Sequence, residues 1–459
     1  MAYDIIVLGG GLSGIAAAIR LSHYGKRVLL CERHFRLGGL NSWYERGGMV
    51  LDTGLHALTN FVGEEQTTAP LNRVLRQLRI RRSVLELHPQ RRSRILFPGT
   101  EILLNNSYED FSAQIREKFP DDAAGFQALS REILQAGYAS EETPWRSANA
   151  VLETHISSTR LRDILRFPVM YYGNARKEDM DFGAYATMFR SVLMEGFARP
   201  AGGMKAFLGV LEQRLAEEGA EVHLGVGAKA LRFDDAGRVL GIVDDQGNEI
   251  AAPKVLSTIG VVETAALCDG CSAEALSDAP AGDIGFLEAI FQAPKAPSEY
   301  GFHDAITFVC RTPEFRFAPP ENSATPESML VCAPGNYDGG GEEERLVRLS
   351  TIVEPSEWLS LPLEEYRAHK LALAETLRGC LAEIAPALAA DLMLVDAFTP
   401  KTVRRWTGRV NGAIYGSPRK FPAFESGVPG LTLAGTDQGL LGITGAMLSG
   451  ILAANRLLA

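Results

Sequence analysis

Short apolar runs at both ends of the chain predict a buried parallel sheet. Residues 5–8 and 28–31 are continuous apolar runs, and residues 431–434 form a similar run near the C-terminus. Strands of a parallel sheet are covered on both faces, so they read as unbroken apolar runs and do not alternate. An Ala-rich helical pattern at 15–24 joins the first two runs and stops at Gly25. The first 32 residues therefore predict a β-α-β unit.

The segments between these runs follow other patterns. Residues 203–218 have an amphipathic helical pattern, and strand-like runs follow at 221–224, 228–233 and 239–243. Polar helical patterns dominate residues 61–195, and residues 266–400 mix helix and strand. We therefore predict an α/β protein with two discontinuous domains. A Rossmann-like nucleotide-binding domain takes residues 1–60, 196–265 and 401–459, and an α+β substrate domain, which could face a membrane, takes residues 61–195 and 266–400.

Composition narrows the class of protein. The chain has 459 residues, is 46% hydrophobic and carries a formal net charge of -10 at pH 7. The apolar content excludes an intrinsically disordered chain, and the acidic charge argues against a nucleic-acid binder. No cationic segment precedes an apolar stretch at the N-terminus, so we predict no signal peptide and a cytoplasmic location. The longest uncharged stretch, 438–455, is interrupted by glycines and reads as a buried helix with its approach loop.

A glycine-rich turn after the first strand carries the strongest chemical signal. Residues 9–14 read GGGLSG, which fits the G-x-G-x-x-G fingerprint between a strand and a helix. Gly9 permits the tight turn, Gly11 lets the backbone approach a pyrophosphate, and Gly14 lets the helix pack on the strand. An acid at the end of the second strand binds a ribose hydroxyl in such folds, and Glu32 stands there. The predicted contacts to the dinucleotide are Gly9, Gly11, Leu12, Ser13, Gly14, Glu32 and Arg33.

The segments after Glu32 indicate which dinucleotide binds. A glycine pair follows at Gly38 and Gly39, and residues 48–56 read GMVLDTGLH. Together they resemble the continuation found in flavoproteins of the amine oxidase superfamily. Residues 431–437 (LTLAGTD) and 442–450 (GITGAMLSG) resemble that superfamily's last strand, flavin-facing loop and final helix. The resemblance implies FAD as the cofactor.

Within that superfamily the chain resembles phytoene desaturases, carotenoid isomerases and retinol saturases. The runs at 52–56, 199–204 and 412–416 carry this resemblance. It implies that Asp437 binds the ribityl or pyrophosphate part of FAD and that the Val226 backbone contacts adenine. Further FAD contacts implied in the same way are Gly38, Gly39, Leu40, Gly54, Leu55, His56, Gly435, Gly442, Ile443 and Thr444. Many relatives have Arg where this chain has Leu40, which fits amine oxidases and typical desaturases less well than saturase-like members.

The resemblance implies an FAD-dependent oxidoreductase that acts on a long apolar isoprenoid, carotenoid-like or other lipid substrate through hydride transfer at flavin N5. Desaturation, saturation and cis-trans isomerisation share this architecture. A flavin amine oxidase is one alternative. A non-enzymatic prenyl-chain binder, similar to Rab escort and dissociation-inhibitor proteins, is another, although Gly11, Glu32 and Asp437 argue against it. No second glycine fingerprint for NAD(P)H is present, so oxygen, a quinone and a protein all stay open as the electron acceptor.

Other residues could add chemistry to the site. His56 lies inside a cofactor-like motif, where it could act as an acid or base or simply pack beside the cofactor. Tyr415 and Trp406 could line the substrate side of the flavin or belong to the core. Cys268 and Cys271 form a C-x-x-C, which we interpret as an unpaired surface turn because no second ligand pair and no thioredoxin-like unit accompany it. No metal site is predicted.

Two segments could contact a membrane. Arginines are concentrated in residues 73–94, whose only acid is Glu86; they are Arg73, Arg76, Arg79, Arg81, Arg82, Arg91, Arg92 and Arg94. A basic amphipathic helix there could meet anionic lipid headgroups, or the arginines could pair with the excess acids of the chain. Residues 161–172 form a second candidate face, for a membrane or a substrate tunnel. We therefore predict a hydrophobic small-molecule substrate and allow for peripheral membrane contact.

Overall fold

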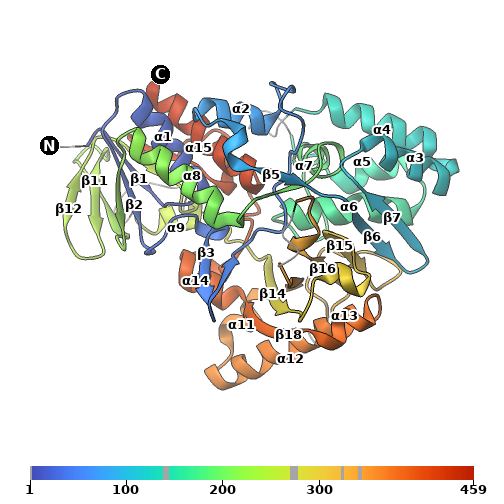
Figure 1. Ribbon diagram of the computed structural model, residues 1–459. Coiled ribbons are helices and arrows are strands. Elements are labelled where there is room, and N and C mark those ends of the chain that lie inside the picture. The colour runs from blue at the N-terminus through green and yellow to red at the C-terminus, as the bar shows by residue number, and fades with distance from the viewer. Residues whose placement is uncertain (1–2, 138–143, 269–275, 277, 322–324, 340–343) are drawn as a thin grey trace.

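The computed structural model describes residues 3–137, 144–268, 276, 278–321, 325–339 and 344–459. Two large β-sheets organise these residues, and each sheet is flanked by helices (Figure 1). Among the described helices, none combines the length and the apolar character that crossing a bilayer requires.

A parallel sheet gathers strands from the start, the middle and the end of the chain. Its order is β19 (Leu431–Leu433), β13 (Val255–Ser257), β1 (Ile5–Leu8), β2 (Val28–Glu32) and β9 (Glu221–Leu224). Each neighbouring pair is parallel, and β1 and β2 are completely buried. The α/β fold predicted from the apolar runs is confirmed. Because the strands are parallel, their carboxyl ends lie along one edge, where dinucleotides bind in such folds.

Helices cover one face of the parallel sheet, and a smaller sheet covers the other. The helices α1 (Leu12–His23), α8 (Gly203–Glu217) and α15 (Gly442–Leu458) share a core with Ile5 and Val7. The oppositely directed Ile6 and Leu8 pack with an antiparallel sheet and with α9 (Val261–Ala265). The strands of that sheet are β10 (Ala228–Phe233), β11 (Val239–Asp244) and β12 (Glu249–Ala251).

A mixed sheet forms the centre of the second unit. Its order is β18 (Met393–Phe398), β14 (Gly285–Gln292), β17 (Leu346–Val353), β16 (Ser328–Cys332), β15 (Ile306–Cys310), β6 (Ser93–Phe97) and β7 (Thr100–Leu104). β15 and β6 are parallel, and the other neighbours are antiparallel.

Helices cover both faces of this mixed sheet. One face packs against α3 (Tyr108–Lys118), α4 (Ala123–Gln135), α5 (Ala148–His155), α6 (Thr159–Gly173) and α7 (Phe182–Phe189). The other packs against α11 (Pro355–Ser360), α12 (Leu363–Ala382) and α13 (Pro386–Asp391). The remaining elements are α2 (Pro70–Gln77), α14 (Pro400–Thr407), the hairpin β3 (Trp43–Arg46) with β4 (Met49–Asp52), and the pair β5 (Leu87–Pro89) with β8 (Ala198–Pro200).

Two sequence expectations for residues 61–195 need correction. The segment was expected to be mainly helical, yet β6 and β7 form a hairpin that joins the mixed sheet. The interpretation of residues 161–172 as a membrane face is wrong, because they lie in α6 and its apolar side chains, such as Leu161, Leu165 and Met170, are buried in the core. Periodicity alone does not separate a core helix from an apolar surface helix.

Candidate functional site

The turn between β1 and α1 leaves backbone amides free for a ligand. Gly9 has a φ of +96°, and a Cβ added to Gly14 would lie 1.9 Å from the Gly9 oxygen, so both positions require glycine. Gly11 is the N-cap of α1, and no side chain caps this helix. A Cβ on Gly11 would meet no heavy atom within 4 Å among the described residues. The first amides of α1 can therefore bind a phosphate group.

The side chains of the first turn of α1 are committed to packing. Leu12 is buried, and the Ser13 hydroxyl donates to the Ala446 carbonyl of α15 at 2.6 Å. A Cβ on Gly450 would lie 1.9 Å from the backbone carbonyl oxygen of Ser13, so the backbones of α15 and α1 are in direct contact where the two helices cross. Of the predicted contacts, Leu12 and Ser13 thus have only their backbone groups to offer a dinucleotide.

Glu32 closes the turn from the end of β2. Its carboxylate accepts hydrogen bonds from the amides of Gly10 at 2.6 Å and His34 at 2.7 Å. A carboxylate can accept about four hydrogen bonds, so capacity for a ribose hydroxyl remains. The Val226 amide donates to the Glu32 carbonyl at 3.0 Å, which leaves the Val226 carbonyl for an adenine contact. Arg33 is exposed and lies beside Gly408.

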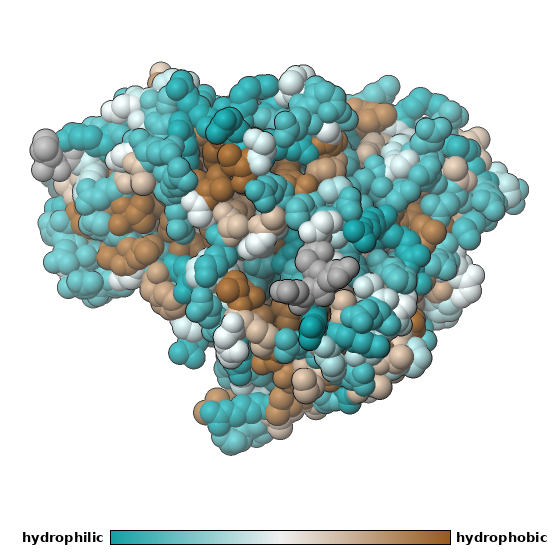
Figure 2. Space-filling view, viewed as in Figure 1, coloured by the Kyte–Doolittle hydropathy of each residue, from teal (hydrophilic) through white to brown (hydrophobic). Residues whose placement is uncertain are grey.

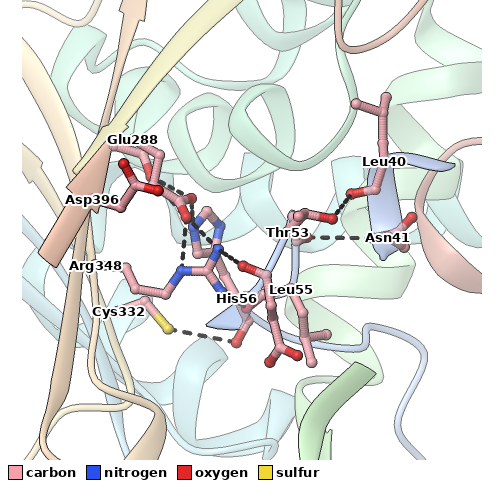
Figure 3. Close-up of polar contacts among 12 residues, drawn as sticks. Leu40, Asn41, Thr53, Leu55, His56, Glu288, Cys332, Arg348 and Asp396 are labelled. Atoms are coloured by element: carbon pink, nitrogen blue, oxygen red, sulfur yellow. Dashed lines mark hydrogen bonds and ion pairs between the residues drawn. The ribbon is translucent and has the colours of Figure 1, made fainter. Parts of the chain in front are cut away.

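The second glycine pair lies directly against the first turn. The Gly38 amide donates to the Gly10 carbonyl at 2.8 Å, and a Cβ on Gly39 would lie 3.2 Å from the Gly11 Cα. The Leu40 carbonyl accepts the Thr53 hydroxyl at 3.1 Å (Figure 3). A Cβ on Gly54 would lie 2.5 Å from the same carbonyl. Glycines from three separate motifs therefore form one backbone surface.

The mixed sheet holds His56 (Figure 3). Its Nε2 lies 2.6 Å from Oε2 of Glu288 in β14 and 3.3 Å from the Ser350 hydroxyl in β17. The His56 carbonyl accepts the Tyr337 hydroxyl at 2.9 Å, and the His56 side chain is only 18% exposed. The motif loop that carries His56 is thus fixed to the second sheet through its side chain and its backbone.

Arg348 keeps Glu288 ionised inside the protein. The Arg348 Nε donates to Glu288 Oε1 at 2.8 Å, and its other nitrogens donate to the carbonyls of Leu55 at 2.9 Å and Asp52 at 3.0 Å. Burial raises the pKa of Glu288, but Arg348 and His56 outweigh burial and lower this pKa to about 2. Neither Glu288 nor Arg348 was predicted from the sequence. Each is the only charged residue in its strand, and that irregularity could have identified them.

A second buried ion pair joins two of the runs that carry the resemblance. Asp52 accepts hydrogen bonds from Arg199 at 2.7 Å and from the Met204 amide at 2.8 Å. Gly203 has a φ of +63°, and a Cβ there would lie 2.6 Å from the Asp52 carboxylate. The runs 52–56 and 199–204 are therefore neighbours in space, which explains why they occur together.

Asp437 holds three segments together at the edge of the parallel sheet. Its carboxylate accepts hydrogen bonds from the amides of Val261 at 2.7 Å and Ser417 at 2.8 Å, and from Arg409 at 3.4 Å. Burial raises the pKa of Asp437, but Arg409, Lys420 and these amides lower it overall. Protein donors thus occupy the carboxylate that was expected to face FAD.

Unpartnered polar atoms surround the start of α15. The Gln438 amide group and the Thr444 hydroxyl are buried, and neither has a hydrogen-bond partner within the described residues. Gly435 has a φ of +118°, Gly442 is exposed, Ile443 is buried, and no side chain caps α15. Buried polar groups are normally satisfied, so a polar ligand or an ordered water would complete these atoms. The pyrimidine edge of a flavin offers donors and acceptors of this kind, and the residues present therefore fit FAD.

The two aromatic candidates lie in different places. Tyr415 packs edge-on against Phe286, with ring centroids 6.2 Å apart, and donates its hydroxyl to the Tyr171 carbonyl. It therefore belongs to the core between the mixed sheet and α6. Trp406 is 44% exposed and lies against His34, with ring centroids 5.1 Å apart, next to the ribose-binding end of β2.

The C-x-x-C lies partly outside the described residues. Cys268 follows α9, and its thiol donates to the Thr264 carbonyl at 3.4 Å. Cys268 is buried, so the expected surface turn is wrong for this residue. Cys271 lies outside the described residues.

The arginine-rich segment divides into two parts. The last three arginines pair with acids: Arg91 with Asp338 at 3.1 Å, Arg92 with Asp304 at 2.6 Å, and Arg94 with Asp304 and Glu101. The expected basic helix is the short α2, which carries Arg73 and Arg76. Arg79, Arg81 and Arg82 follow in the turn after α2. Pairing with acids is therefore confirmed for the second half of the segment, whereas lipid contact by the first half stays a prediction.

Comparison with known proteins bears on both fold and family. The model of the flavin-containing amine oxidoreductase family matches residues 12–458. Prolycopene isomerase of Daucus carota is 22% identical, with 94% of this chain and 75% of the relative covered. All-trans-retinol 13,14-reductase of Danio rerio is 23% identical, with 97% and 84% covered.

Solved structures show the same fold. An oxidoreductase of Methanosarcina mazei superposes with a TM-score of 0.70 at 17% identity, covering 98% of this chain and 99% of the other. Putrescine oxidase superposes with a TM-score of 0.63 at 16% identity, covering 100% and 99%. Since the family model spans nearly the whole sequence, the chain belongs to the flavin-containing amine oxidoreductase family and is an FAD-dependent oxidoreductase.

Proposed function

We propose that the enzyme acts on a long apolar isoprenoid of the carotenoid or retinoid kind. The observation that carries this proposal is the similarity, over more than nine-tenths of the chain, to relatives named for prolycopene and retinol. Desaturation, saturation and cis-trans isomerisation all suit such a polyene substrate. The family name includes amines, yet the relatives compared above, prolycopene isomerase and retinol 13,14-reductase, are named for polyenes.

The proposed FAD contacts follow the line of motifs from α1 to α15. The amides of Gly11, Leu12, Ser13 and Gly14 bind the pyrophosphate, Glu32 binds the adenosine ribose, and the Val226 carbonyl contacts adenine. The backbone surface of Gly38, Gly39, Leu40 and Gly54 lies against the middle of the cofactor. Gln438, Thr444 and the first amides of α15 receive the pyrimidine edge. Asp437 acts as a positioning residue, because its carboxylate already holds Val261, Ser417 and Arg409.

Bound FAD supplies hydride-transfer chemistry, and the chain supplies position and a dry environment. Tyr172 of α6 stacks on Phe197, with ring centroids 5.1 Å apart, and its buried hydroxyl has no partner within the described residues. Tyr415 belongs to the same aromatic core. Aromatic rings can contact an apolar polyene, but they also bind amine cations, so the named relatives and not these rings favour a polyene. His56 has its Nε2 engaged by Glu288, so we propose that it positions loop 52–56 and that any proton it exchanges uses Nδ1.

The acceptor and the cellular setting are also proposals. Electrons go to oxygen, a quinone or a protein, since the sequence holds one glycine fingerprint. A polyene substrate resides in a bilayer, and we propose peripheral membrane contact through the half of the arginine-rich segment that lacks acidic partners.

Anaerobic incubation of the flavin-loaded enzyme tests the reaction. Isoprenoids of graded length, with and without a quinone, are compared with a diamine, while flavin absorbance and product mass are followed. We expect a polyene to change by two hydrogens, or to change only its isomer composition, and the diamine to leave the flavin oxidised. Bleaching by the diamine alone would replace the isoprenoid proposal with amine oxidation. A colourless protein that binds no added FAD would instead indicate a prenyl-chain binder.

A further inference from the structure

A cavity of about 350 Å³ lies outside the flavin site, between the loop at 63–69, α2 and the turn after α2. Figure 1 shows α2 at the upper edge of the molecule, beside α15, against which it packs. Small-molecule sites start at about 300 Å³, so this cavity can take more than a single ion. Its lining residues are Glu64, Thr67, Asn72, Leu75, Arg76, Arg79, Ile80, Arg81 and Arg82.

The cavity carries an excess of positive charge in an acidic protein. Four arginines and one acid, Glu64, line it, although the whole chain has a net charge of -10. Arg79 and Arg81 are exposed, and neither side chain has a hydrogen bond or an ion pair with any described residue. An arginine side chain offers five N–H donors, so these two bring ten donors that no described protein group uses. Two acids, Glu64 and its neighbour Glu65, act on Arg82.

The walls of the cavity are held in place. Arg76 donates to the Thr67 carbonyl at 3.1 Å, and Arg82 donates to the Asn72 side chain at 2.8 Å. The Asn72 amide in turn donates to the Gly63 carbonyl at 2.9 Å. The Arg82 guanidinium also lies over the Phe61 ring, 5.1 Å from its centroid. These contacts fix the loop, the helix and two of the four guanidinium groups.

Arg79 occupies a backbone conformation that usually belongs to glycine. Its φ is +57°, directly after α2, where the Ile80 amide donates back to the Leu75 carbonyl at 2.9 Å. Helices that end in this way normally have glycine at this position. The left-handed backbone of Arg79 sets the direction in which the chain leaves α2, and it makes Arg79 a lining residue of the cavity.

We propose that this cavity binds a phosphate-bearing ligand. Several guanidinium groups around one space match a multiply charged phosphate better than a singly charged carboxylate, because planar N–H pairs bind phosphate oxygens in parallel. The phosphate comes from a lipid headgroup or from a soluble phosphate compound. The inference deepens the proposed membrane contact in the first case, and in both cases it is independent of the flavin reaction.

Two variants test the cavity without disturbing the fold. Arg79→Gly removes a guanidinium and suits the left-handed backbone, so its melting temperature should be unchanged or higher. Arg81→Ser removes an exposed side chain without protein partners. Arg238→Ser, at an exposed turn of the small antiparallel sheet, removes the same charge elsewhere. All are prepared flavin-loaded, so that the dinucleotide site is filled.

Inorganic pyrophosphate is titrated first, with isothermal calorimetry and thermal shift as readouts. We expect binding to the wild type and to Arg238→Ser, and roughly tenfold weaker binding to Arg79→Gly and Arg81→Ser. Equal affinity in all four proteins would show that pyrophosphate binds elsewhere and would contradict the proposed phosphate site in the cavity.

Vesicles then identify the source of the phosphate. Phosphatidylcholine vesicles that contain phosphatidic acid are compared with vesicles given the same surface charge by oleate. Preferential binding to phosphatidic acid, lost in Arg79→Gly and Arg81→Ser, supports a lipid phosphate. Pyrophosphate binding without vesicle binding supports a soluble phosphate compound. Equal binding to both vesicles without pyrophosphate binding contradicts the phosphate site but agrees with membrane contact. No binding in either experiment contradicts the phosphate site and the membrane contact.

Discussion

At the scale of single residues, the predicted dinucleotide site depends on glycines, which have no side chain. Gly11 leaves open space at the start of α1, and its φ of -72° is ordinary for any amino acid. The protein alone therefore does not require glycine at this position, unlike Gly9 and Gly14. The demand comes from the cofactor, whose pyrophosphate needs the space above the backbone.

Gly11→Val should separate folding from cofactor binding. The added Cβ has no described heavy atom within 4 Å, and the side chain occupies the space proposed for the pyrophosphate, so we expect FAD retention to fall by at least about tenfold. The free energy of unfolding of the flavin-free protein should change by about 1 kcal/mol or less. Absorbance of the purified protein and FAD titration measure the first effect, and urea unfolding measures the second. Gly137→Val, at an exposed position with no described heavy atom within 4 Å of an added Cβ, is the control. Equal flavin content in the two variants would contradict the assignment.

At the scale of elements, two helices from opposite ends of the chain cross at backbone contact. The Ser13 hydroxyl bonds to the Ala446 carbonyl, and Gly450 lies against the Ser13 oxygen. The N-termini of α1 and α15 belong to the two ends of the proposed FAD site. Their crossing therefore sets the distance between the pyrophosphate and the flavin ring.

Gly450→Ala should open this crossing. The new Cβ would lie 1.9 Å from the Ser13 oxygen and 3.1 Å from the Ala17 amide, both backbone atoms. We expect a loss of about 1–3 kcal/mol in the free energy of unfolding, together with weaker FAD binding. Gly209→Ala, in the exposed part of α8 with no neighbour within 4 Å, is the matched control. It should gain up to about 1 kcal/mol, because alanine favours a helix. Similar urea midpoints for Gly450→Ala and Gly209→Ala would contradict the close backbone contact between α1 and α15.

The sequence predicted the elements whose signals are local. β1, α1, β2 and the final helix follow from apolar runs and glycine positions. The β6–β7 hairpin was missed because it is short and carries the charged Arg94, whose partner Asp304 is more than 200 residues away. The engagement of His56 by Glu288 was missed for the same reason, since only the folded chain brings residues 56, 288 and 348 together.

At the scale of the whole molecule, charged groups join the two sheets. The motif loop 52–56 follows β4 of the β3–β4 hairpin and packs against Leu40 on the side of the parallel sheet, while Glu288 and Arg348 belong to the mixed sheet. Arg348 donates to the backbone of the loop, and Glu288 holds both Arg348 and His56. This buried network fixes the motif loop 52–56 to the mixed sheet.

Glu288→Gln should weaken the whole protein. It keeps the shape of the side chain but removes the main counter-charge of the buried Arg348, so we expect a loss of about 3–5 kcal/mol in the free energy of unfolding at pH 7. Glu364→Gln removes one partner of the exposed pair with Arg367 and should cost less than about 1 kcal/mol. Urea unfolding of the two variants measures the difference. A small effect at Glu288 would show that the network does not hold the sheets together.

Acid should remove the stabilisation that ionised Glu288 gives to the folded wild-type protein. The pKa of Glu288 is lowered on folding from 4.5 to about 2, so its ionised form stabilises the folded state above pH 4.5. That stability is lost as the pH falls from 4.5 towards 2, because the unfolded chain takes up the proton first. The stability difference between wild type and Glu288→Gln should therefore shrink over this interval. A constant difference down to pH 2 would place the effect elsewhere.

The discontinuous parallel sheet also sets the order of events during synthesis. β19 and α15 follow α1 by more than 400 residues in the sequence, and α15 covers α1. The nascent chain must therefore keep the apolar faces of β1 and α1 uncovered until α15 has been synthesised, and long-range pairing of this kind is slow and prone to aggregation. The proposed flavin site needs both helices, so the supply of FAD acts on the yield of folded enzyme only after α15 has been synthesised.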